Sequence, residues 1–234
     1  MSIQKMTGKI THIIDLSKTA KEITISLPKP LEFRAGSFVN VFMDINGQKI
    51  RRAYSISSSE QNTQQITITV RLSPDGAMTP IFWNQDMIGH QIELMGPLGV
   101  NTVDKMHHKK IYLFAFGVGA GVVRSIAEHF IHRDPLEHLT IVTGSKSENE
   151  MLYQEYFDQL SHESAVVKTL HVVSKPNEGS NIPKGYIQHH IDIFDFNHSD
   201  VYICGQESAC ADLVNKIKST NPDDCEFFIE AFHR

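Results

Sequence analysis

The chain is poor in cysteine. Its 234 residues include only Cys204, Cys210 and Cys225. None of the three forms a C-x-x-C pair, so neither a zinc site nor an iron–sulfur cluster can be read from them. A small, odd number of cysteines is also typical of proteins from a reducing cytosol.

The sequence also lacks a long hydrophobic run. The longest apolar stretch, residues 111–123, is too short to span a membrane and is rich in glycine. The N-terminal residues 1–5 do not begin the apolar core of a signal peptide. We therefore expect a soluble cytoplasmic protein that does not enter a membrane.

An excess of basic residues is absent as well. The chain has 22 Lys and Arg against 27 Asp and Glu, which gives a net charge of −5 with its 13 His neutral. Binding to nucleic acid without sequence preference needs a basic stripe, so no nucleic-acid partner is expected. The hydrophobic content of 41% and the charged content of 21% predict a packed globular protein.

Short segments that alternate apolar and polar residues occupy the first hundred positions. The pattern predicts a strand over residues 9–27 and a short helix over 78–87, with a hairpin turn at Asn46-Gly47. Further strands are predicted at 38–44, 50–57, 65–72 and 92–94. Short strands with regular turns favour an antiparallel barrel or sandwich.

The pattern changes after a polar, charged segment at residues 104–110, so we place the domains at 1–104 and 105–234. Strands and helices then alternate. Strands are predicted at 110–116, 139–143, 166–173, 201–204 and 226–231, and helices at 121–131, 150–160, 185–193 and 208–218. This alternation predicts a doubly wound parallel sheet with helices on both faces.

Residues 51–58 combine two guanidinium groups, a flat aromatic ring and four hydroxyls. An Arg fork suits phosphate oxygens, Tyr54 offers a face for a planar heterocycle, and Ser can bond a ring nitrogen. An edge strand with a basic face is the alternative. Because side chains alternate along a strand, Arg52 and Tyr54 should face away from Ser55. All three can touch one ligand only if the strand bends or the ligand wraps around its end.

A second candidate phosphate site follows the predicted strand 110–116. The sequence Gly117-Val118-Gly119-Ala120-Gly121 leads directly into a helix pattern. Glycine lets the backbone approach a phosphate, and a helix N-terminus offers free N–H groups. The spacing is not that of the common dinucleotide fingerprint, and such a turn can also be mere packing. A stacked ring in a barrel beside a nucleotide-binding sheet is an arrangement suited to hydride transfer.

Over nearly its whole length the chain resembles the ferredoxin–NADP reductase family of flavoproteins. Arg52-Ala53-Tyr54-Ser55 with Ser58 is similar to the family's R-x-Y-S-x-x-S motif, and Gly96-Pro97-Leu98-Gly99 to its G-P-x-G. The loop 117–122 lies where the family has G-T-G-I-T-P. Cys204-Gly205 matches the Cys-Gly beside the nicotinamide, and 229–232 matches a C-terminal segment with Glu and an aromatic residue at the flavin.

The resemblance implies FAD and NADP (or NAD) as cofactors and assigns residues to them. The flavin residues would be Arg52, Ala53, Tyr54, Ser55, Ser58, Val70, Arg71, Leu72, Gly76, Ala77, Met78, Thr79 and Phe232. The nicotinamide nucleotide would lie on Gly117, Val118, Gly119, Ala120, Gly121, Ser145, Lys146, Cys204 and Gly205. Ser145 or Lys146 would hold a 2′-phosphate, which favours NADPH; Lys146 is alternatively a solvated loop charge.

Three residues would be catalytic by the same resemblance. Ser55 is expected at flavin N5, Cys204 beside the nicotinamide, and Glu230 as a source of local polarity or a proton relay. The alternatives are an ordinary strand serine, a buried small apolar cysteine and a surface acid. The paired histidines of the chain are interpreted as surface residues, and no metal site is expected.

The expected activity is electron transfer between NAD(P)H and a ferredoxin or flavodoxin by way of FAD. The expected form is a monomeric, bare two-domain reductase with a separate electron partner, and Arg51 is left to face an acidic partner. Val118, Gly121 and Val122 replace Thr, Thr and Pro of the family loop, which removes a hydroxyl near the nicotinamide. Two alternatives remain: a flavin reductase that releases its flavin, and a flavin-binding redox-sensing subunit.

Overall fold

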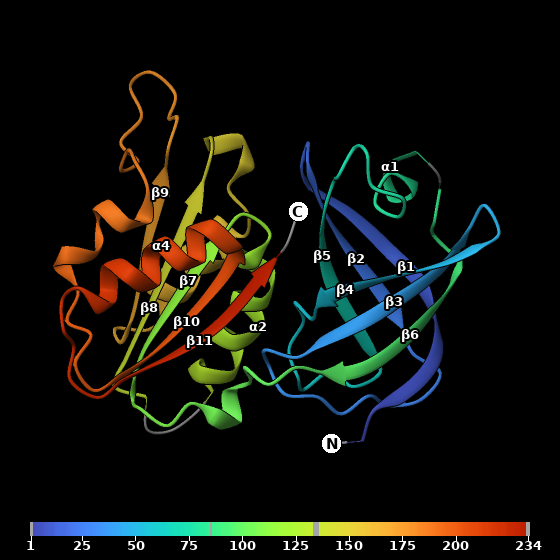
Figure 1. Cartoon of the computed structure of the whole chain (residues 1–234), viewed down its shortest axis with the longest axis horizontal. Helices are drawn as coiled ribbons and strands as arrows, with labels where there is room; N and C mark the ends of the chain where they lie inside the picture. The colour runs from blue at the N-terminus through green and yellow to red at the C-terminus, as the bar shows by residue number, and fades with distance from the viewer. Residues whose placement is uncertain (1, 85, 133–135, 233–234) are drawn as a thin grey trace.

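The computed structural model describes residues 2–84, 86–132 and 136–232. An all-β domain and an α/β domain lie side by side, and the helix α2 (Gly119–Ile131) is on the side of the α/β domain that faces the β domain (Figure 1). The sequence predicted this fold class, which is confirmed: a curled antiparallel sheet is followed by a parallel sheet with helices.

The β domain is a curled sheet of six antiparallel strands in the order β4-β3-β6-β1-β2-β5. The strands are β1 (Gln4–Ser17), β2 (Ala20–Ser26), β3 (Phe38–Ile45), β4 (Gln48–Ser55), β5 (Gln65–Arg71) and β6 (Gln91–Leu98). A bridge between Ile56 and Ile68 brings the two sheet edges together, so the sheet encloses an apolar core.

Two predictions for this domain differ from the structure. Residues 9–27 form two strands rather than one, because the chain reverses at Lys18-Thr19 without a Gly or Pro to mark the turn. The helix α1 is only Ile81–Asn84, and residue 85 of the predicted 78–87 lies outside the described residues. The hairpin turn is confirmed, with positive φ at Asn46 and Gly47.

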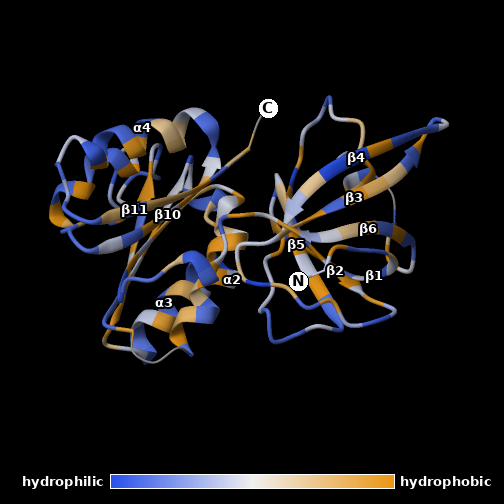
Figure 2. Ribbon diagram, turned by 60° about the horizontal axis from the view of Figure 1, so that its bottom comes forward, coloured by the Kyte–Doolittle hydropathy of each residue, from blue (hydrophilic) through white to orange (hydrophobic). Residues whose placement is uncertain are grey.

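The second sheet is parallel, with five strands in the order β11-β10-β7-β8-β9. The strands are β7 (Lys110–Phe116), β8 (His138–Ser145), β9 (Val167–Val173), β10 (Ser199–Gln206) and β11 (Cys225–Phe232). In Figure 2 β10 is largely hydrophobic, and its residues 199–205 are buried, as expected of a central strand with both faces covered.

Helices cover both faces of this sheet, as predicted. The helices α2 and α3 (Gln154–Glu163) pack on one face, and α4 (Glu207–Lys218) packs on the other. The predicted short helix at 185–193 is instead two 3-10 turns, η3 (Ile187–His189) and η4 (Ile191–Ile193), on the α4 face. Two further 3-10 turns are η1 (Val103–Lys105) and η2 (Glu148–Glu150).

The two domains share part of one apolar core. Ala20 and Ala35 of the β domain are fully or almost fully buried in the cluster formed by α2 and the parallel sheet. Burial of apolar surface at this junction favours a fixed relative position of the domains. Within the described residues no helix has the length and apolar character needed to cross a membrane.

A histidine joins two aspartates at the amino ends of the parallel strands. His108 Nδ1 lies 2.8 Å from Oδ1 of the fully buried Asp200, and its Nε2 lies 3.2 Å from Oδ2 of Asp224. Asp224 also contacts His198 Nδ1 at 3.3 Å. Burial of the imidazole opposes its protonation, but the bonds to Asp200 and Asp224 outweigh burial and raise the pKa of His108 above 6.5.

The raised pKa of His108 predicts a pH-dependent stability. Its contribution is fully present below the unfolded pKa of about 6.5 and is lost as pH rises through the higher folded pKa. We expect His108→Asn to lower the free energy of unfolding by about 1 kcal/mol near pH 6 and by less at alkaline pH. Urea unfolding across this range measures the difference. A constant difference at all pH values would contradict the prediction.

Candidate functional site

The segment predicted to hold a flavin lies at the end of β4. Tyr54 is half-buried, and its hydroxyl lies 3.6 Å from the sulfur of Met78 in the turn before α1. Burial raises the pKa of Tyr54 to about 12, so its hydroxyl is neutral at physiological pH. This contact brings together the two segments of the predicted flavin site, residues 52–58 and 76–79.

The pairing of the chain changes directly after the motif residues 52–55. The strand β4 ends at Ser55, and Ile56 then bridges Ile68 of β5. Arg52, Tyr54 and Ser55 lie within β4 in regular register, so a ligand that touches all three must wrap around the end of this strand. The Ser55 hydroxyl is half-buried and has no hydrogen-bond partner among the described residues, whereas the Ser58 hydroxyl accepts a bond from the amide of Thr67.

The turn at residues 73–79 provides free backbone donors. The Thr79 hydroxyl closes this turn, since it accepts a bond from the Ser73 amide and donates to the Ser73 carbonyl. Among the described residues, the amides of Ala77, Met78 and Thr79 have no acceptor. Free amides in a tight turn fit the phosphates of a flavin dinucleotide. The guanidinium of Arg52 is exposed and donates to the Arg51 carbonyl at 2.8 Å.

The second phosphate site lies at the carboxyl end of β7. Gly117 has a φ of +55° and donates to the carbonyl of Gly144. The amides of Val118 and Gly119 have no acceptor among the described residues, so they point out of the first turn of α2 as donors. The Arg71 guanidinium of the β domain lies 3.9 Å from the Cβ position of Gly117. This donor set fits a pyrophosphate.

Three glycines at this site are also required by close packing. A Cβ at Gly119 would collide with the carbonyl of Cys204, and a Cβ at Gly121 would collide with the Thr69 hydroxyl of the β domain. Gly205 has a φ of +157°, and a Cβ there would lie 2.5 Å from that of Phe116. The glycines therefore let α2, β10 and β5 approach one another as well as exposing backbone amides.

The predicted catalytic pair, Cys204 and Glu230, lies on adjacent strands in register. Cys204 is fully buried, and burial holds the pKa of its thiol well above the ordinary range. Burial also raises the pKa of the half-buried Glu230 carboxyl, although a bond from Asn101 opposes the shift. Phe232, at the end of β11, is half-buried against the same core. The thiol is neutral, and the carboxyl retains its proton to higher pH than an exposed glutamate does.

Ser145 and Lys146 lie in a cluster of lysines that sequence reasoning did not find. The Lys175 amide donates to the Lys146 carbonyl at 2.9 Å, and Val173, two residues earlier, pairs with Lys184. The three lysines are exposed, and none forms an ion pair with another described residue. The lysines come together because residues 174–175 continue alongside residues 145–146 and the loop after β9 returns along the free edge of β9 at Lys184, which spacing in the sequence does not reveal.

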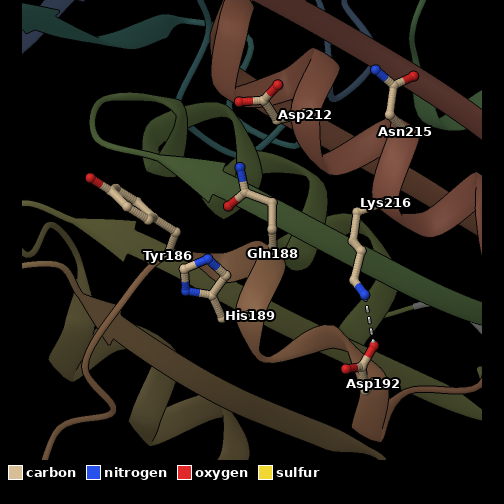
Figure 3. Close-up of a pocket in the computed structure, with 7 residues that line it drawn as sticks. All are labelled: Tyr186, Gln188, His189, Asp192, Asp212, Asn215 and Lys216. Carbon is tan, nitrogen blue, oxygen red and sulfur yellow. Dashed lines mark ion pairs between the residues drawn. The ribbon is translucent and has the colours of Figure 1, made fainter.

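A pocket of about 560 Å³ lies between η3 and α4, and Tyr186 in its lining follows Lys184 by two residues (Figure 3). Tyr186, which is 62% exposed, lines it, and the Gln188 side-chain oxygen is buried in its wall without a partner among the described residues. On the opposite side Lys216 of α4 lies 3.4 Å from Asp192. A flat aromatic ring beside an unpaired amide oxygen is suited to a nucleobase.

The fold and these two sites define a flavin- and nicotinamide-dependent oxidoreductase module. Comparison with known families agrees: residues 7–102 match the oxidoreductase FAD-binding domain, and residues 113–215 match the oxidoreductase NAD-binding domain. The chain belongs to the ferredoxin–NADP reductase family of flavoproteins, whose cofactors are FAD and a nicotinamide dinucleotide.

Two curated relatives and one solved structure illustrate the family. The reductase component of phenol 2-monooxygenase from Pseudomonas sp. strain CF600 is 24% identical over 99% of this chain and 66% of its own length. Ferredoxin–NADP reductase B of Sorangium cellulosum is 24% identical over 79% of this chain and 76% of its own length. The ferredoxin NADP+ reductase of Neisseria gonorrhoeae with bound FAD and NADP superposes with a TM-score of 0.85 at 18% identity, covering 96% and 98%.

The chain is shorter than several of these relatives. It spans 66% of the Pseudomonas reductase component, 44% of a phenol hydroxylase P5 protein and 56% of a glycine betaine monooxygenase reductase subunit. Within the described residues, no group of three His, Cys, Asp or Glu side chains is arranged to hold a metal ion.

The contact between Gly119 and β10 gives a test of the nucleotide site. We expect Gly119→Ala to lower the free energy of unfolding by about 2 kcal/mol and to weaken nucleotide binding, because α2 must move away from the Cys204 carbonyl. Thermal unfolding and nucleotide titration measure the two effects. Gly179→Ala is the comparison variant: it measures the cost of Ala at a positive φ in open space, and it should leave nucleotide binding unchanged. Equal effects of the two variants would contradict the role of close packing.

Proposed function

We propose that this chain transfers electrons from NADPH, through FAD, to a separate one-electron carrier such as a ferredoxin or a flavodoxin. The observation that carries the proposal is the direct contact between the first turn of α2 and β5, with Gly121 against Thr69 and Arg71 against Gly117. This contact supports the proposal because it would leave the two candidate dinucleotide sites on either side of one domain junction. The FAD would supply hydride acceptance and one-electron release.

The β-domain residues would bind and orient the flavin. Arg52 would neutralise charge on its phosphates, and the amides of residues 77–79 would donate hydrogen bonds to them. The Tyr54 ring would stack on its planar ring system. Ser55, with its unpaired hydroxyl, would bond the reactive edge of the flavin. The remaining residues of the predicted set would contribute backbone and packing contacts around the same turn.

The α/β-domain residues would bind the nicotinamide nucleotide. The amides of Val118 and Gly119 would bind the pyrophosphate together with Arg71. The buried Cys204 would shape the floor of the nicotinamide site through packing, because its thiol is neutral. Glu230 would hold a proton on its carboxyl near that floor, and Phe232 would shield the junction from water. The inferred division near residue 104 would leave each cofactor mainly on one domain.

The lysine cluster supports a preference for NADPH over NADH. A 2′-phosphate beside Lys146, Lys175 and Lys184 would be held by three otherwise unpaired cations, and the adenine would occupy the pocket at Tyr186 and Gln188. The adenosine ribose of NADH carries no 2′-phosphate, so it would not use these charges. This assignment extends the predicted Ser145 and Lys146 to a larger subsite.

Titration with FAD, and then with nucleotide, tests the proposed activity. We expect FAD to quench the single tryptophan, Trp83, because α1 directly follows the 76–79 turn. Anaerobic NADPH should then bleach the visible flavin absorbance. Turnover of added flavin by a colourless protein would support a flavin reductase instead. Bound flavin that neither NADPH nor NADH reduces would contradict the proposal and support a redox-sensing subunit.

Replacement of two lysines tests the nucleotide preference. We expect the double variant Lys146→Ala, Lys175→Ala to raise the KM for NADPH at least about tenfold, since the loss of even one charged contact to phosphate costs about 1.4 kcal/mol. The KM for NADH should stay unchanged. Lys168→Ala, an exposed lysine at the opposite end of β9, is the matched control. A parallel rise for both nucleotides would contradict a 2′-phosphate site.

A further inference from the structure

Four polar side chains meet across the domain junction, outside both phosphate sites. Glu22 of β2 and Thr69 of β5 are direct neighbours in the antiparallel β sheet. Arg124 of α2 and Tyr153, the residue before α3, reach them from the α/β domain. We call these four residues the junction cluster.

The contacts of the junction cluster are short: two of them end on one carboxylate oxygen of Glu22, and the third joins Thr69 to Tyr153. Glu22 Oε2 accepts bonds from Arg124 Nη1 at 2.7 Å and from the Tyr153 hydroxyl at 2.8 Å. The Thr69 hydroxyl lies 2.7 Å from the Tyr153 oxygen. Because Tyr153 donates to Glu22, Thr69 is the donor to Tyr153. Glu22 is almost fully buried, so its charge depends on these partners.

Tyr153 keeps an unfavourable backbone conformation at this position. Its φ is 57° and its ψ is 23°, in the left-handed region that non-glycine residues rarely occupy. Such a conformation persists only where surrounding contacts enforce it, and it is most common at functional sites. Here it directs the phenol across the junction while the ring packs on the Arg124 guanidinium, with 5.2 Å between the Arg124 Cζ and the ring centre.

The junction cluster lies between the two cofactor-binding segments. Thr69 is two residues before Arg71, and Arg71 reaches the glycine loop. Arg124 is one turn after Gly121, the residue whose missing side chain makes room for Thr69. A shift of Tyr153 or Arg124 would therefore move the first turn of α2 relative to β5. Small displacements of this kind strongly affect transfer rates, which require close approach of the reacting atoms.

We propose that Tyr153 and Arg124 are positioning residues that fix the nucleotide-binding end of α2 against β5 and so set the approach of the nicotinamide to the flavin. The inference rests on the proposed function, because it concerns the geometry of the same transfer. Neither residue touches the reacting atoms. Their effect passes through the bonds to Glu22 and Thr69.

The variants Tyr153→Phe and Thr69→Val test this role, since each removes one hydroxyl of the junction. Tyr156→Phe is the control for contacts that do not cross the junction: the Arg124 guanidinium lies 5.2 Å from the centre of the Tyr156 ring, and the Tyr156 hydroxyl acts on Glu128 and Arg124, both of which belong to α2. Thr69→Ser keeps the hydroxyl and should restore wild-type behaviour. Stopped-flow mixing with NADPH gives the limiting rate of flavin reduction and the charge-transfer absorbance of the bound pair. Hydrogen exchange of residues 117–125, measured on the cofactor-free chain, reports how firmly the first turn of α2 is held.

We expect Tyr153→Phe and Thr69→Val to lower the limiting rate about tenfold and to weaken the charge-transfer absorbance. Affinities for FAD and NADPH should change less than about twofold, and exchange in the first turn of α2 should rise. Wild-type rates, absorbance and exchange in both variants would overturn the positioning role. Loss of thermal stability without these changes would also overturn it. A wild-type chain whose bound flavin is not reduced would instead refute the proposed function.

Discussion

The structure depends on the close approach of α2 to β5. A side chain at Gly121 would occupy the space of the Thr69 hydroxyl, so the absence of that side chain sets the separation of the two domains. The Ser125 hydroxyl then donates to the Ser58 carbonyl at 2.7 Å, and His129 lies 2.9 Å from Glu60. One face of α2 thus contacts β5 and the segment that follows β4 in the β domain. Two cofactors held this way would react without a large domain movement.

The same constraint explains the unusual glycine loop. A side chain at position 121 would need the space that Thr69 occupies, so Gly121 allows α2 to pack closely on β5. Gly119 and Gly205 act together at the carboxyl ends of β7 and β10, where each removes a side chain that would force the strands and α2 apart. A loop that departs from the dinucleotide fingerprint can therefore still offer free amides at a helix N-terminus.

Charge is distributed unevenly between the two ends of the α/β domain. Unpaired lysines gather at the carboxyl ends of β8 and β9, where anionic ligands bind in parallel sheets. His108 and Asp200 pair at the amino ends, away from the phosphate sites, and so serve stability. Around Cys204 and Glu230 burial favours the neutral thiol and raises the pKa of the carboxyl.

The sequence by itself determined the fold class and most strands, because alternation and apolar runs record which side chains face a core. The motif from Arg52 to Ser55 and the glycine loop could also be recognised as candidate sites in the sequence, because both depend on local backbone and side-chain chemistry. The sequence did not reveal the turn at Lys18-Thr19, which carries no Gly or Pro. Only the tertiary structure decided the lysine cluster and the contact of Tyr153 with Glu22, because these residues are far apart in the chain. The role of Gly121 also depended on its neighbour Thr69, which no local pattern can specify.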